Sequence, residues 1–144
     1  MSEPRDILWI MFDPWGTLRH LVHVTVRWVR MPDNVPGRTN GTDIIWLDNR
    51  LQQVERRCVL AHELVHVERR HIGCQPPAVE RSVRIETARR LIPIGELCRH
   101  VAWARSHAEL ADELWVTEMV LTDRLSSLTP DETTALSMVE VQTH

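Results

Sequence analysis

Hydrophobic and polar residues alternate along residues 20–31, which is the pattern of a half-buried β-strand. One face carries Val22, Val24, Val26 and Trp28, and the other carries His23, Thr25 and Arg27. Short apolar runs rich in β-favouring residues predict further strands at 7–12 and 43–48. A turn at 13–16 and a loop at 31–42, both marked by Pro and Gly, separate the strands. The first third of the chain is therefore predicted to be a small antiparallel sheet.

The pattern changes after residue 50. Residues 51–71 contain no Gly or Pro and predict one long helix, which Gly73 is expected to cap. Two prolines at 76–77 open a second helix at 78–92, and Pro93 ends it. Further helices are predicted at 94–105, 107–114, 117–127 and 130–141. A sheet followed by helices predicts an α+β fold.

The composition narrows the class of protein. A chain of 144 residues suits a single domain with a core of ordinary size. It has no run of the about 20 apolar residues that span a membrane, and its N-terminus does not resemble a secretory signal. The chain has three cysteines, a small and odd number that does not indicate a disulfide framework. All 17 basic residues are arginine, as in GC-rich bacteria or their phages. We therefore expect a cytoplasmic protein of a bacterium or an infected bacterial host, with no membrane partner.

Charge is distributed unevenly behind the net value of −3. Residues 50–105 carry 11 Arg against 6 acidic residues, whereas residues 106–144 carry one Arg against 8. A basic segment attracts nucleic acid or pairs with an acidic segment of its own chain. Residues 108–125 fit a helix–turn–helix pattern. A DNA-reading helix needs cations, but this segment contains five acidic residues and Arg124 as its one basic residue. Direct nucleic-acid binding is not expected.

Two histidines and a glutamate interrupt the apolar helix pattern of residues 59–73. His62 and His66 are four residues apart, so a helix places both rings on one face, where they can bind one Zn²⁺. Glu63 follows the first histidine closely enough to reach a water held by that metal. This is the H-E-x-x-H pattern, in which the glutamate is the general base.

A catalytic zinc needs three protein ligands and an open position. His71 lies about 140° around the helix from His66, so it cannot join the same metal while the helix continues. A carboxylate of the next helix, Glu80 or Glu86, is the remaining source. Both lie near the apolar stripe of that helix, so periodicity does not choose between them.

Three stretches of the chain resemble one known family. R-R-C-V-L-A-H-E-L-V-H (56–66) and E-R-S-V-R-I-E-T-A-R-R-L-I-P (80–93) are similar to motifs of the ImmA/IrrE zinc metallo-endopeptidases, and 108–125 is similar to their trailing segment. The resemblance covers about residues 43–128. It implies a zincin-like core and a gluzincin-like ligand set of His62, His66 and Glu80, because Glu80 precedes Pro93 by the family's 13 residues.

The same resemblance implies an enzyme with one catalytic Zn²⁺ and Glu63 as catalytic residue. Its substrate would be a protein, such as a transcriptional repressor in a phage, mobile-element or stress-response setting. The single domain, 1–144, would comprise a sheet (1–49), zinc-site helices (50–105) and C-terminal helices (106–144). Strand 43–48 is the expected edge strand for pairing with an extended substrate.

Arg84 stands where the family has Asp or Asn, and a guanidinium cannot accept a hydrogen bond from a ligand imidazole. A pair between Arg84 and Glu80 would compete with the metal. The alternative is thus a catalytically weak zinc-containing protein that sequesters a regulator. Because the chain has no tyrosine, the oxyanion donor must be a His, an Arg or a backbone N–H. The candidate histidines are His71, His100 and His107.

Overall fold

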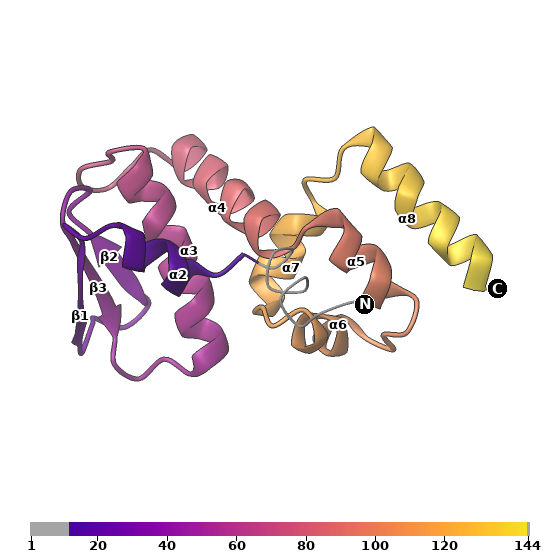
Figure 1. Ribbon diagram of the computed structural model, residues 1–144, viewed down its shortest axis with the longest axis horizontal. Helices are drawn as coiled ribbons and strands as arrows, with labels where there is room; N and C mark the ends of the chain where they lie inside the picture. Colours follow the sequence, from indigo (N-terminus) through magenta and orange to yellow (C-terminus); the bar gives the residue numbers. More distant parts are fainter. Residues whose placement is uncertain (1–11, 144) are drawn as a thin grey trace.

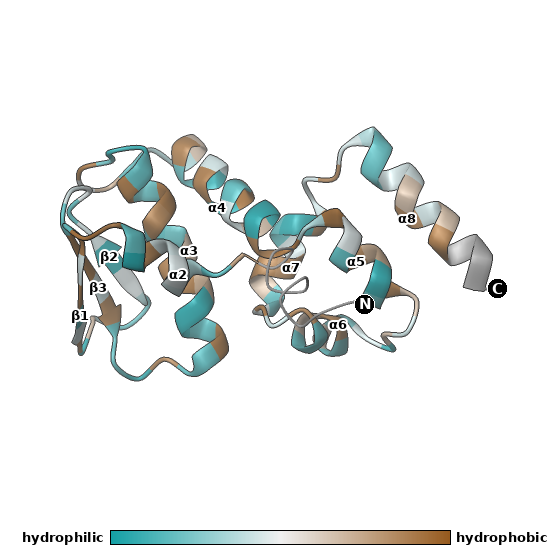
Figure 2. Cartoon of the chain, in the orientation of Figure 1, coloured by the Kyte–Doolittle hydropathy of each residue, from teal (hydrophilic) through white to brown (hydrophobic). Residues whose placement is uncertain are grey.

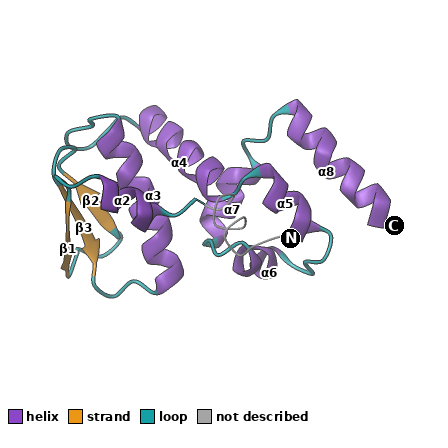
Figure 3. Ribbon diagram, in the orientation of Figure 1, coloured by secondary structure: helices purple, strands orange, loops and turns teal. Residues whose placement is uncertain are grey.

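The computed structural model describes residues 12–143, which form seven helices and one three-stranded sheet (Figure 1, Figure 3). This confirms the α+β class. The strand predicted at 7–12 lies outside the described residues, apart from Phe12. In chain order the elements are α2 (Pro14–His20), β1 (Thr25–Val29), β2 (Gly37–Thr39), β3 (Ile44–Asp48), α3 (Gln53–Glu68), α4 (Pro77–Leu91), α5 (Ile94–Val101), α6 (His107–Glu113), α7 (Glu118–Leu125) and α8 (Pro130–Thr143).

The sheet is mixed, with the strand order β1-β3-β2. β1 runs parallel to β3, with Thr25 beside Ile44, whereas β2 is antiparallel to β3, with Gly37 beside Leu47. The prediction of a purely antiparallel sheet was wrong because the segment 31–42, expected to be a loop, contains a strand. The chain therefore reverses twice between β1 and β3.

Two local predictions were also wrong at their boundaries. The turn expected at 13–16 is the first turn of α2, where the Asp13 side chain accepts a hydrogen bond from the N–H of Trp15 at 3.1 Å. Asp-Pro suits a helix N-terminus as well as a turn. α3 ends at Glu68 rather than near Gly73, and Arg70 takes a left-handed conformation, with φ of 58°.

Hydrophobic side chains form two core clusters, and hydrophobic positions recur along helices at both ends of the molecule (Figure 2). One cluster joins the sheet to α3 and includes Ile45, Leu47, Leu60, Leu64 and Val67. The other joins the C-terminal helices to the far side of α3 and to the end of α4, and includes Cys58, Ala61, Leu91, Leu97, Leu110 and Leu121. α4 packs against both α3 and α7, so it connects the two regions (Figure 1).

No helix in the described part of the chain combines the length and the apolar character that crossing a membrane requires.

A buried ion pair holds the C-terminal helices together. Arg124 of α7, only 1% exposed, places two guanidinium nitrogens 2.6 and 3.1 Å from the carboxylate of Glu132 in α8. Its Nε donates to the carbonyl of Ile92, just after α4, at 2.7 Å. Arg89 of α4 binds the same carboxylate at 3.0 and 3.1 Å. Hydrogen bonding from Arg124, supported by Arg89, therefore holds the pKa of Glu132 well below its usual value.

We predict that Glu132→Gln lowers the free energy of unfolding at pH 7 by about 3 kcal/mol, because it leaves Arg124 buried without a counter-charge. The folded pKa lies below the unfolded value of 4.5, so the carboxylate stabilises the fold above that pH and loses this effect as the pH falls below it. Urea unfolding at pH 7 and pH 3 should show the difference between wild type and variant shrinking in acid. Asp131→Asn, at the exposed neighbouring position, is the control. An equal difference at both pH values would contradict the prediction.

Candidate metal centre

The candidate site lies on α3, which is buried between the two core clusters. Leu60 and Leu64 pack toward the sheet, while Cys58 and Ala61 pack toward the C-terminal helices. Apolar residues on these two sides make the segment helical and fix its rotation. The side chains that remain on the third side, His62 and His66 among them, line a cleft of about 760 Å³.

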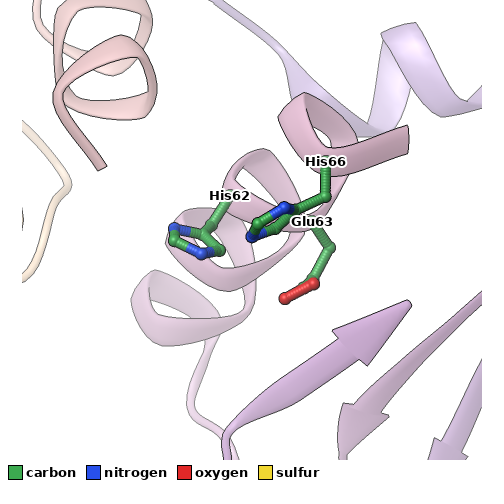
Figure 4. Close-up of side chains that lie close together, drawn as sticks. All are labelled: His62, Glu63 and His66. Carbon is green, nitrogen blue, oxygen red and sulfur yellow. The ribbon is translucent and has the colours of Figure 1, made fainter. Parts of the chain in front are cut away.

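His62, Glu63 and His66 each offer one ligand atom, and these atoms all lie within 4.8 Å of one another (Figure 4). The three side chains project from the same stretch of α3 and could hold a metal ion. The two imidazole rings meet edge to face, with their centroids 5.0 Å apart. Glu63 and His66 are each only 6% exposed, and polar side chains buried to this degree usually have a partner.

α4 brings a second carboxylate to the two rings. Glu80 Oε1 lies 3.1 Å from His66 Nε2, and Glu80 Oε2 lies 3.5 Å from His62 Nε2. The Nε2 atoms of both histidines therefore converge on one carboxylate. Glu86, the other carboxylate considered, pairs instead with Arg90 at 3.1 Å and with Arg69 at 3.9 Å. The structure brings Glu80 and not Glu86 to the rings, while its role as a ligand stays a prediction.

Burial sets the protonation of the site. It lowers the pKa of His62, an effect to which the neighbouring His66 adds and which the negative charge of Glu80 partly offsets. Burial likewise lowers the pKa of His66. Both rings are thus neutral at neutral pH, which is the form that binds a metal. Burial and the charge of Glu80 raise the pKa of Glu63 to about 8. A divalent cation at this position would favour the ionised carboxylate instead.

The cleft runs between the sheet and α7. Residues 34–39 line one side, and Thr117, Met119 and Val120 line the other. β2 is the edge strand on the cleft side, whereas β3 pairs on both of its edges. The prediction that strand 43–48 is the edge strand was wrong. The segment that contains β2 is rich in Pro, Gly and Asn, so it was expected to be a loop and not a strand.

Arg84 does not pair with Glu80. Its Nε lies 3.5 Å from Oδ2 of Asp123 in α7, and both residues line the cleft. Asp123 thus takes up the charge that would have competed for the Glu80 carboxylate. This contact joins two helices that are distant in sequence, so no local pattern could have indicated it.

The three candidate oxyanion donors lie in different places. His71 lines the cleft, and its Nδ1 lies 3.0 Å from Nδ1 of His66. His100 lies 3.5 Å from Glu96, and His107 lies 3.3 Å from Glu118; neither lines the cleft. The contact between His71 and His66 was missed because the helix was expected to continue through His71. It ends three residues earlier, so the chain can turn back.

Comparisons with models of protein families, with curated proteins and with solved structures find no match to this chain.

We predict that Glu80→Ala weakens zinc binding by more than the about 100-fold that loss of an outer-shell partner can cost. Glu86→Ala should leave the affinity unchanged, because Glu86 is held by arginines. Titration of each purified variant against a zinc chelator measures the effect. Loss of zinc in Glu86→Ala with retention in Glu80→Ala would reverse the assignment.

Proposed function

We propose that this protein is a zinc-dependent endopeptidase whose metal is held by His62, His66 and Glu80. The observation that carries the proposal is the convergence of both Nε2 atoms on the Glu80 carboxylate, with Glu63 beside them. Two imidazoles and one carboxylate form a donor set used by catalytic zinc, and they leave a position open. The neutral state of the two rings fits this role.

Zinc supplies Lewis acidity at this position when it is bound. Glu63 is the proton carrier: it takes a proton from the attacking water and passes it to the nitrogen of the leaving amine. Burial raises the pKa of Glu63, and a bound divalent cation would counteract that rise, so the metal-loaded site would hold the carboxylate ionised and ready to accept the proton of the water. The surrounding apolar helix keeps bulk water from the back of the site.

β2 supports a polypeptide as the substrate. An extended segment can pair with the edge of this strand that no other described strand occupies, and so lie along the cleft. Gly37 of β2 packs so closely on Val59 of α3 that a Cβ at position 37 would overlap the Val59 side chain. The edge strand is therefore held at a set distance from His62, one turn further along the same helix.

The setting follows from the resemblance of residues 56–66 and 80–93 to the ImmA/IrrE motifs. By this likeness the substrate is a transcriptional repressor, cleaved in the cytoplasm of a bacterium during phage or mobile-element induction or a stress response. The arginine-only basic composition agrees with such a source.

The alternative is a catalytically weak zinc protein that sequesters a regulator. Arg84 favours it, because this cation lines the cleft and lowers the pKa of His62 beyond what burial does. A group that disfavours added positive charge beside a metal ligand weakens the site.

We predict that Glu63→Gln lowers the cleavage rate by about 10²- to 10⁴-fold while zinc binding and fold are kept, because only the proton carrier is lost. The zinc-loaded protein is incubated with a peptide library, and products are identified by mass spectrometry. Glu55→Gln, on the same helix and also lining the cleft, is the matched control. If Glu63→Gln retains the biological effect of the wild type, the sequestration alternative holds instead.

A further inference from the structure

Both ring nitrogens of His66 have a partner. Nε2 faces the Glu80 carboxylate at 3.1 Å, and Nδ1 lies 3.0 Å from Nδ1 of His71. The rings of His66 and His71 meet edge to face, with their centroids 5.2 Å apart. Because His66 is only 6% exposed, the contact with His71 takes the place of water at Nδ1.

The fold holds His71 in this position from both sides. Arg70, in its left-handed conformation, reverses the chain, and the N–H of His71 donates to the carbonyl of His66 at 3.0 Å. On the other side, Gly41 packs against the His71 carbonyl so closely that a Cβ there would overlap it. Asn40 fixes that glycine turn by accepting hydrogen bonds from three N–H groups at 3.0 to 3.1 Å. His71 is therefore a built part of the site, although it follows the helix.

We propose that His71 is a positioning residue that orients His66 and selects the tautomer that binds metal. This inference rests on the proposed zinc site. A metal at Nε2 needs the lone pair of that nitrogen, so the ring proton must sit on Nδ1 and requires an acceptor. Nδ1 of His71 is the acceptor within hydrogen-bond distance. The contact with His71 thus fixes the orientation of the His66 ring, so that Nε2 points into the cleft.

An imidazole in this place does more than a carboxylate would. When the His66 proton lies on Nε2, facing the Glu80 carboxylate, Nδ1 can accept a hydrogen bond from His71. With metal bound, the direction reverses: the shared proton sits on His66 Nδ1, and His71 carries its own proton on Nε2. The buried ring keeps a hydrogen-bond partner in both states, which avoids the cost of an unsatisfied polar group.

The experiment compares the zinc affinity of wild type, His71→Leu and His71→Asn by competition with a chromogenic chelator. We expect His71→Leu to bind zinc about 10- to 100-fold more weakly. His71→Asn should regain most of this loss, because its amide oxygen can accept a hydrogen bond near the former place of Nδ1. His23→Leu, at an exposed histidine outside the cleft, should match the wild type. Long-range ¹H–¹⁵N NMR of the zinc-loaded wild type should show the His66 proton on Nδ1.

Two results would overturn the inference: unchanged zinc affinity in His71→Leu, or His71→Asn binding as weakly as His71→Leu. If His71→Leu does not fold, His71→Gln replaces it, because its longer amide passes the place of Nδ1 and should not rescue. A wild type that binds no zinc would refute the proposed function as well. A wild type that binds zinc with no dependence on residue 71 would refute the positioning role alone.

Discussion

The structure depends on a helix that is buried on two sides and carries ionisable groups on the third. Leu60 and Leu64 pack α3 against the sheet, and Cys58 and Ala61 pack it against the C-terminal helices. This leaves Glu63 and His66 in a place with little water, where burial drives both toward their neutral forms. His66 has Glu80 and His71 as partners, whereas ionisation of the buried Glu63 costs free energy that a divalent cation would offset. The physical case for a metal is therefore stronger than the motif by itself.

The position of Glu80 depends on contacts far from the site. α4 carries this residue near its start, whereas its end is held to α7 and α8 through Arg89 and the buried pair of Arg124 with Glu132. Midway along α4, Arg84 contacts Asp123 of α7. The C-terminal helices thus set the direction of α4, and α4 sets the distance between Glu80 and the two histidines. The packing of the C-terminal half is in this sense part of the site.

Local signals were enough to predict the parts of the site that lie on single helices. The absence of Gly and Pro from residues 51–71 and the prolines at 76, 77 and 93 placed both helices to within a few residues. The signals failed where the outcome depends on distant pairing. β2 consists of three residues in a segment of turn-forming composition, and only hydrogen bonds to β3 make it a strand. The end of α3 could not be predicted from local signals either, because Arg70 adopts a left-handed backbone conformation that is uncommon for residues other than glycine.

The contacts of the candidate residues also reduce the number of groups that could stabilise an oxyanion. His100 and His107 pair with acidic residues away from the cleft, and His71 uses Nδ1 to contact His66. Arg84 lines the cleft near enough to His62 for its charge to act there, and its contact with Asp123 is made through Nε. Arg84 would therefore have two opposite effects on the proposed chemistry: its charge disfavours added positive charge at His62, and the same charge would favour a negative charge that develops in the cleft.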